Sequence, residues 1–206
     1  MVQRLKSVLL VLSGPSGVGK RTVRDEMKKL VPELPVSISC TTRPARQEDS
    51  EVDGIHYWFL TREAFETAIE AGEFLEWAEV AGNLYGTRKA QVDARLEAGE
   101  DLLLELDVQG GASMKRLYPD AVLVFVMPPD WATLESRLIN RGSEDAASLQ
   151  RRLGIAREEL RFGFEHYEYL IVNHTDRAEE AAREVAAIYH AECARRARLG
   201  WSEEDG

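Results

Sequence analysis

A glycine-rich stretch near the start of the chain has the composition and spacing of a phosphate-binding loop. Gly14, four further residues, Gly19 and Lys20 stand between an apolar run and a helix-forming segment. A turn in that position can point backbone N–H groups at phosphate oxygens, and the positive end of the helix dipole adds to the attraction. Lys20 then reaches the β- and γ-phosphates of a nucleotide. We expect the following residues to bind a nucleoside triphosphate: Gly14, Pro15, Ser16, Gly17, Val18, Gly19, Lys20, Arg21 and Thr22.

Arg21 stands where such loops carry a Ser or Thr that holds magnesium. Because Mg²⁺ keeps several waters and touches the protein through few ligands, loss of one hydroxyl is compatible with metal binding. Thr22 keeps a hydroxyl near the phosphates. We expect Arg21 to point away from the metal or to pair with an acidic neighbour, while nucleotide oxygens and water hold the ion.

Arginines gather in two further short segments, although the formal net charge is −10. An acidic chain with concentrated cations favours a small polyanion as ligand over nucleic acid or an anionic membrane surface. In the first segment Arg43 and Arg46 can form bidentate hydrogen bonds to one phosphate. The second segment holds Arg137, Arg141, Arg151 and Arg152.

The composition is that of a globular protein with one sizeable core. The chain has 206 residues, of which 44% are hydrophobic and 30% charged, and no apolar stretch is long enough to span a bilayer. Cys40 and Cys193 lack the spacing of a zinc site or a disulfide framework. We expect a cytoplasmic protein without a nucleic-acid or membrane partner.

Four continuous apolar runs predict strands that are buried on both faces of a parallel sheet. They are Val8–Leu12, Leu102–Leu106, Val122–Val126 and Leu170–Val172. Amphipathic patterns predict helices over Thr22–Leu30 and Ala178–Leu199. The pattern favours an α/β fold.

Residues 39 to 91 have a different pattern, typical of a small α+β insert. Strands are predicted over His56–Leu60, Phe74–Val80 and Asn83–Thr87, and a helix begins after the N-cap Thr61. We expect Trp58, Phe59 and Trp77 in the core of this insert. A charged helical region follows from Trp131 to Arg161.

Six motifs in a fixed order resemble the guanylate kinase family. They are "SGPSGVGK", "SISCTTRPAR", "EVDGIHYWFL", "GEFLEWAEVAGNLYGT", "LLELDVQGG" and "RLINRG", and they extend from about Val8 to about Asp176. The resemblance implies transfer of a phosphoryl group from ATP to GMP, giving ADP and GDP, with Mg²⁺. It also implies a P-loop core with a mostly parallel five-stranded sheet flanked by helices. The core would comprise residues 1–37, 92–130 and 162–206, the GMP-binding insert residues 38–91 and the lid residues 131–161.

Glu76 is the residue that would select guanine. Its carboxylate matches the paired N1–H and N2–H donors of the guanine edge, which adenine lacks, and a wrong base would leave buried groups unsatisfied. The resemblance implies that Arg43, Arg46, Tyr57 and Tyr85 hold the GMP phosphate. The full expected GMP site is Ser39, Arg43, Arg46, Glu51, Tyr57, Glu76, Tyr85, Thr87 and Asp107. Glu105 is expected near the water shell of the metal.

The turn after Arg46 departs from the family pattern by two extra residues and a missing glycine. Glu51 matches the expected carboxylate because Val52-Asp53-Gly54 follow it, but Asp49 could take its place.

The resemblance implies that lid arginines complete the catalytic set with Lys20. These are Arg137, Arg141 and Arg152, with Arg151 as an alternative to the last. No general base is required, since the acceptor is a phosphate oxygen that is largely deprotonated near neutral pH. Catalysis then rests on positioning and on neutralising charge.

Two other functions fit parts of the sequence. A guanylate-kinase-like module that binds a phosphorylated partner without catalysis would explain Arg21, whereas Lys20 and the lid arginines favour an enzyme. A P-loop kinase with another acceptor is the second alternative, and Glu76 with Ser39 favours guanine. Both a monomer and a homodimer are compatible with the sequence.

Overall fold

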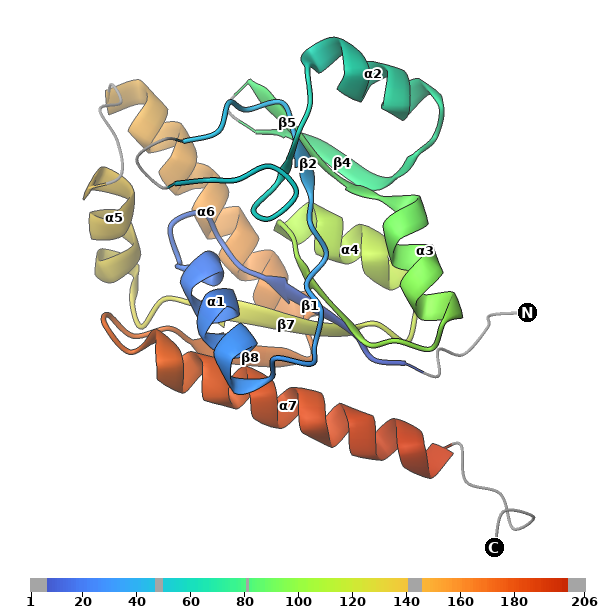
Figure 1. Cartoon of the computed structure of the whole chain (residues 1–206). Helices are drawn as coiled ribbons and strands as arrows, with labels where there is room; N and C mark the ends of the chain where they lie inside the picture. Colours follow the sequence, from blue (N-terminus) through green and yellow to red (C-terminus); the bar gives the residue numbers. More distant parts are fainter. Residues whose placement is uncertain (1–6, 47–49, 81, 141–145, 200–206) are drawn as a thin grey trace, which may run out of the picture.

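The computed structural model describes residues 7–46, 50–80, 82–140 and 146–199. Two sheets and seven helices are found in these ranges. The larger sheet forms the centre of the molecule, α7 (Ala178–Leu199) runs along one side of it, and the smaller sheet lies on the side away from α7 (Figure 1).

The central sheet is parallel throughout and confirms the predicted α/β class. Its order is β6-β1-β7-β8, and its strands are β1 (Leu9–Ser13), β6 (Leu102–Glu105), β7 (Val122–Met127) and β8 (Tyr169–Val172). In place of the expected fifth strand, the chain makes a single parallel bridge between Val36 and Leu103. Around it, Leu103 N donates to Pro35 O and Ser37 N donates to Leu103 O, both at 2.9 Å.

Helices cover both faces of this sheet, which is why its strands are continuously apolar. Leu10 and Leu12 face α1 (Lys20–Leu30) and α7, which pack against each other. Leu9 and Val11 face the other way, toward α3 (Lys89–Glu97) and α4 (Val108–Leu117). The phosphate loop therefore sits between a strand and a helix that are both anchored in the core.

The smaller sheet belongs to the insert and has the order β3-β2-β5-β4. Its strands are β2 (Cys40–Thr41), β3 (Trp58–Phe59), β4 (Phe74–Val80) and β5 (Asn83–Arg88). Helix α2 (Arg62–Glu70) packs on it, and Thr61 caps α2 as predicted by accepting a hydrogen bond from Ala64 N.

The prediction that Trp58 and Trp77 form the core of the insert was wrong. These residues are 40% and 49% exposed, respectively. The buried cluster of the insert consists of Cys40, Phe65 and Leu84, with Leu60, Ile69 and Phe74 packed against it, and the two indole rings lie outside this cluster.

The helical region that follows Asp130 consists of α5 (Trp131–Asn140) and α6 (Ala146–His166). Helix α6 runs without interruption across the predicted boundary at residues 161 and 162. Arg141 lies outside the described residues, as does Asp49.

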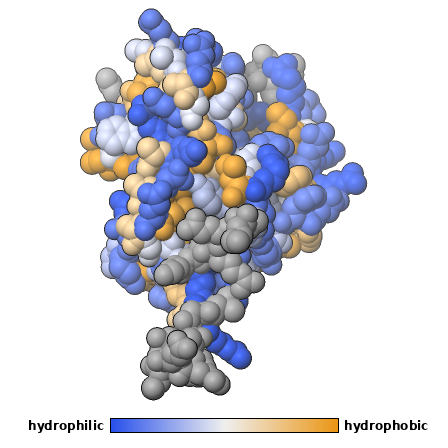
Figure 2. Space-filling view, turned by 90° about the vertical axis from the view of Figure 1, so that its right-hand side faces the viewer, coloured by the Kyte–Doolittle hydropathy of each residue, from blue (hydrophilic) through white to orange (hydrophobic). Residues whose placement is uncertain are grey.

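The surface is polar over most of the face shown in Figure 2, where hydrophobic side chains form small groups among hydrophilic ones. No helix in the described part of the chain combines the length and apolar character needed to cross a bilayer.

Candidate active site

The loop between β1 and α1 adopts the backbone conformation that requires its glycines. The φ angles of Gly14, Gly17 and Gly19 are 153°, 85° and 95°, values that residues other than glycine rarely adopt. A Cβ on Gly14 would lie 2.4 Å from Val126 O, and one on Gly19 would lie 2.6 Å from Asn173 Nδ2. The loop is therefore closely packed against the ends of β7 and β8.

Lys20 lies across this loop, as a phosphate-binding lysine would. Its Nζ donates to Gly14 O at 2.5 Å and approaches Pro15 O at 3.4 Å. On the other side, Ser16 N donates to the Glu159 carboxylate at 3.4 Å. Burial raises the pKa of Glu159, while the charge of Lys20 works to lower it. A carboxylate from α6 thus lies at a loop amide that phosphate would otherwise engage.

Arg21 pairs with acidic residues, as expected. Its Nη1 donates to Glu51 Oε1 at 3.1 Å, and its Nε lies 3.9 Å from Asp25 Oδ2. Glu51 belongs to the insert, 30 residues further along the chain. The first turn of α1 is therefore connected directly to the expected acceptor site.

Glu51 is the carboxylate that organises the arginine-rich turn. Its side chain is 0% exposed and accepts hydrogen bonds from Arg43 Nη2 to both oxygens and from Arg46 N, all at 2.9 Å. Burial works to raise the pKa of Glu51, but the Arg46 amide and the Arg43 guanidinium outweigh it, and the pKa is lowered. Between the two carboxylates left open by the sequence, Glu51 makes the contact with Arg43.

Two tyrosines stand beside Arg43. Its guanidinium carbon lies 5.6 Å from the ring centroid of Tyr57, within cation–π distance, and the rings of Tyr57 and Tyr85 meet edge to face at 6.1 Å. Tyr85 is on β5, whereas Tyr57 directly precedes β3. Ser39, next to β2, accepts a hydrogen bond from Trp58 N through its backbone.

Two acidic residues, Glu76 and Asp107, lie close together where the insert meets α4. Thr87 Oγ1 donates to Glu76 Oε1 at 2.6 Å, and Thr87 is fully buried. Asp107 caps α4 by accepting from Gly110 N at 2.7 Å, and a Cβ on Gly110 would lie 3.0 Å from Glu76 Oε2. Burial and the nearby charge of Asp107 raise the pKa of Glu76 to about 7, against the opposing hydrogen bond from Thr87. A ligand that donates hydrogen bonds to this carboxylate would stabilise its ionised form.

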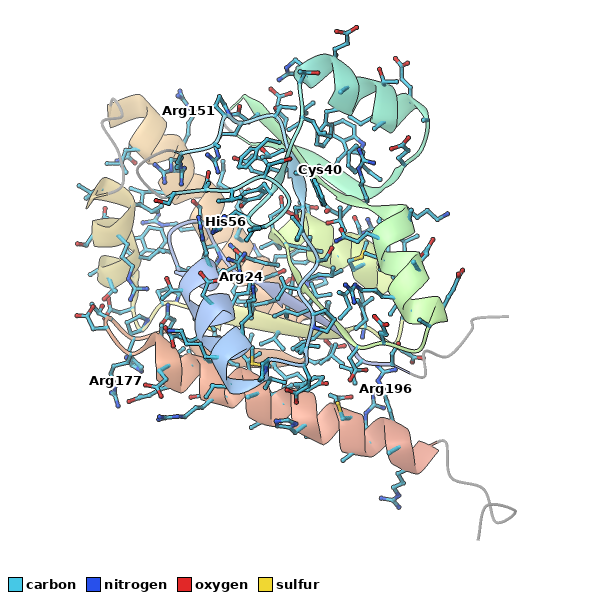
Figure 3. The ribbon with its side chains drawn as sticks, in the orientation of Figure 1. Arg24, Cys40, His56, Arg151, Arg177 and Arg196 are labelled. Carbon is cyan, nitrogen blue, oxygen red and sulfur yellow. The ribbon has the colours of Figure 1, made fainter. Side chains whose placement is uncertain are left out.

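Arg24 is a site residue that the sequence analysis missed. It follows Lys20 by four positions and hence lies on the same face of α1, which is the signal that could have revealed it. Its Nη1 donates to Glu105 Oε2 at 2.8 Å, and its side chain is 15% exposed. Figure 3 shows Arg24 in the space between α1 and the insert.

Comparison with known proteins decides the family. The guanylate kinase family model matches residues 6–192 of this chain. The chain belongs to the guanylate kinase family. A guanylate kinase from Symbiobacterium thermophilum is 44% identical over 97% of this chain and 92% of its own length. One from Thermotoga maritima is 41% identical over 93% of this chain and 90% of its own length.

A solved structure agrees with this assignment. The crystal structure of guanylate kinase from Anaplasma phagocytophilum has a TM-score of 0.71 and 32% identity, and the match covers 93% of this chain and 88% of that one. The family resemblance and the enzyme class expected from the sequence, a nucleoside monophosphate kinase, are thereby confirmed.

The family's expected lid arginines occupy different surroundings. Arg137 of α5 donates to Val18 O at 3.1 Å and to Asn173 O at 3.2 Å, so its guanidinium already contacts the phosphate loop. Arg152 is on α6, seven residues before Glu159 and on the same face. Arg151 lies toward the end of α6 that is far from α7 (Figure 3).

The donor groups near the loop also fit the expected magnesium ion. Glu105 offers a hard oxygen ligand, 20% exposed, at the carboxyl end of β6. Arg24 donates a hydrogen bond to Glu105 Oε2. Glu105 would therefore contact the ion through water rather than as part of a complete set of protein ligands. The described residues contain no group of three or more His, Cys, Asp or Glu arranged to hold a metal.

Proposed function

We propose that this chain catalyses the magnesium-dependent transfer of the γ-phosphoryl group of ATP to GMP and dGMP, giving ADP and GDP or dGDP. The observation that carries the proposal is the pairing of two different sites in the insert. One is cationic and built on Arg43, and the other is acidic and built on Glu76. A nucleoside monophosphate offers a charged end and a hydrogen-bonding end to match them.

Guanine fits the acidic site through its donors. Its N1–H and N2–H groups can donate to the two oxygens of Glu76, and Asp107 stands close enough to raise the pKa of that carboxyl. Adenine has no pair of donors on the corresponding edge, so its binding would leave a desolvated carboxylate unsatisfied. Thr87, which donates to Glu76 Oε1, keeps the carboxylate oriented.

The phosphate of GMP would bind beside the Glu51 network. Arg43 and Arg46 would bind it, and the hydroxyls of Tyr57 and Tyr85 would donate to it. The second ionisation of the phosphate has a pKa of about 6, so the attacking oxygen needs no general base near pH 7. The requirement that remains is to bring two anionic groups together in line and without water.

The positive charge for this approach comes from residues on both sides. The loop amides and Lys20 would bind the ATP phosphates, and Arg137, Arg141 and Arg152 would approach from the lid formed by residues 131–161. Mg²⁺ supplies charge neutralisation on the β- and γ-phosphates when bound, and Glu105 would contact it through water. We propose that the insert and the lid are residues 38–91 and 131–161, around a core of the remaining segments. We also propose a cytoplasmic monomer or homodimer.

A coupled assay of ADP formation tests the function. Purified protein with Mg-ATP is offered GMP, dGMP, AMP and UMP in turn, and GMP and dGMP are expected to be preferred by at least about a hundredfold in kcat/KM. The K20A variant is the control for contaminating kinases and should lose nearly all activity. Absence of turnover with every acceptor would favour a binding module, and preference for AMP or UMP would contradict the guanine assignment.

A further inference from the structure

The ion pair between Arg21 and Glu51 connects the phosphate loop with the expected acceptor site. Arg21 is in the first turn of α1, next to the phosphate-binding Lys20. Its guanidinium turns away from the loop and reaches the insert, where Glu51 Oε1 lies 3.1 Å from Nη1. At 33% exposure the Arg21 side chain is partly screened, whereas the Glu51 side chain is fully buried.

Each oxygen of Glu51 is shared between two donors. Oε1 accepts from Arg21 and Arg43, and Oε2 accepts from Arg43 and from the backbone N–H of Arg46. A carboxylate with four such bonds has no remaining freedom to rotate. Arg43 is therefore held by Glu51, together with a hydrogen bond from its Nη1 to Pro44 O at 2.7 Å. Glu51 is in turn held by Arg21.

The charge balance gives Arg21 a second consequence. Without it, Glu51 and Arg43 would form a one-to-one pair whose charges cancel, and Arg43 would be a weaker ligand for an anion. With it, two guanidiniums share the Glu51 carboxylate beside Tyr57, while Asp25, 3.9 Å from Arg21 Nε, offsets part of the added positive charge. The guanidinium of Arg43 is then less fully neutralised by Glu51, which favours an arriving phosphate dianion.

We propose that Arg21 is a positioning residue for the acceptor. It holds Glu51, and through Glu51 it presents Arg43 to the phosphate of the nucleoside monophosphate. In this way the residue at the magnesium-hydroxyl position of the loop serves the second substrate rather than the metal. The inference rests on the proposed function, because it concerns the GMP site of that reaction.

A purely local role for Arg21 makes a different prediction. The guanidinium also lies 3.9 Å from Asp25, one turn along α1, and such a surface pair contributes little to the stability of a helix. If that were its function, removal of Arg21 would alter the melting temperature slightly and would affect ATP and GMP alike.

The test measures the two substrates separately. The R21A and R21K variants are compared with wild type and with K29A, which removes an exposed α1 cation paired with Glu26. R21A should raise the KM for GMP, and the Kd for GMP measured by calorimetry without ATP or Mg²⁺, by about tenfold. The KM for ATP should stay within about twofold. R21K should recover part of the loss, and K29A should match wild type.

A second background identifies the route of the effect. In E51Q, where the carboxylate charge is absent, adding R21A should change the GMP Kd by less than about twofold, and circular dichroism confirms that each variant is folded. An equal effect of R21A in both backgrounds, an unchanged GMP Kd, or a rise in the KM for ATP alone would overturn the inference. Wild-type protein that fails to phosphorylate GMP would instead overturn the proposed function.

Discussion

At the scale of single residues, burial of the Glu76 carboxyl carries a cost in stability. Burial raises its pKa from 4.5 to about 7, so the folded protein binds this proton more tightly than the unfolded chain. Ionisation of Glu76 therefore lowers the free energy of unfolding as the pH rises from about 4.5 to about 7. A guanine that donates two hydrogen bonds would offset this cost through its binding free energy. It would do so only when Glu76 is ionised.

The pH dependence of GMP binding follows from that pKa. With a pKa of about 7, roughly nine tenths of Glu76 is protonated at pH 6 and one tenth at pH 8, so its ionisation should lower the KM for GMP about tenfold over this range, or about twentyfold together with ionisation of the GMP phosphate. The E76Q variant should have a much higher KM and lack this dependence, retaining only the roughly twofold change due to the GMP phosphate. Steady-state kinetics at constant ionic strength measures both, and a flat wild-type profile would show that Glu76 does not read the base.

Several site residues could be identified from the sequence, the assignment of one carboxylate stayed open, and Arg24 was missed. The glycines, Lys20 and Arg43 were identifiable because their chemistry depends on local spacing. The motif Val52-Asp53-Gly54 favoured Glu51 over Asp49, but the contact of Glu51 N with Arg46 O at 3.2 Å could not be read from that motif. Arg24 was missed because its partner, Glu105, lies 81 positions away.

At the scale of elements, α6 contains two glycines in opposite environments. A Cβ on Gly163 would lie within 2.5 to 2.6 Å of three ring carbons of Phe125, which is fully buried in β7. A Cβ on Gly154 would meet nothing within 4 Å. The close approach at Gly163 is what lets α6 pack directly on the sheet.

These two positions allow a matched pair of variants. Alanine favours a helix over glycine by up to about 1 kcal/mol, so G154A should raise the free energy of unfolding by roughly 0.5–1 kcal/mol. G163A should lower it by about 1–3 kcal/mol, because the added methyl group forces the Phe125 ring to move. Urea denaturation measures both values; stabilisation by G163A would mean that α6 is more loosely packed than described.

The elements with strong patterns were predicted well. Fully buried strands such as β1 and β7 have continuous apolar runs, and Phe74–Val80 and Ala178–Leu199 match their predicted ranges. The short strand β3 covers only Trp58–Phe59, although a run from His56 to Leu60 was predicted. Its length is set by pairing with the two-residue strand β2, a tertiary constraint that propensity does not contain.

At the scale of the whole molecule, the expected ligand-binding residues and the hydrogen bonds of Asp101 lie at opposite ends of the sheet. The loop, Glu105 and Asp107 follow the carboxyl ends of parallel strands, where such sheets bind ligands. Asp101 precedes β6 at the amino end. It accepts hydrogen bonds from Val8 N at 2.6 Å and from the Tyr189 hydroxyl of α7 at 2.7 Å.

This separation predicts a variant that changes stability alone. D101A should lower the free energy of unfolding by about 2–3 kcal/mol, because it leaves a buried amide and a hydroxyl without their acceptor. The KM values for ATP and GMP at 25 °C should remain within about twofold of wild type. E100A, which removes a half-exposed partner of Arg95, is the control and should change stability by less than about 0.5 kcal/mol. A large rise in either KM for D101A would contradict the separation.

The order of the strands and the arrangement of the two sheets lay beyond the sequence analysis without the family resemblance. Periodicity identifies β8 as a strand, but it does not reveal that β8 pairs in parallel with β7 after the connection through α5 and α6. The contact of Arg21 with Glu51 depends on the same global arrangement, since it joins the core helix to the insert.

Because Gly163 packs tightly on Phe125, a rotation of α6 about this contact as a pivot would move the residues of the helix by unequal distances. Arg152 lies 11 residues before Gly163, about 16 Å along the helix axis at roughly 1.5 Å per residue. A tilt of about 10° at the pivot would carry the Arg152 backbone about 3 Å, and Glu159, only four residues from the pivot, about 1 Å. The same small rotation would therefore move Arg152 by about the length of a hydrogen bond, whereas Glu159, beside Ser16, would move only about a third as far.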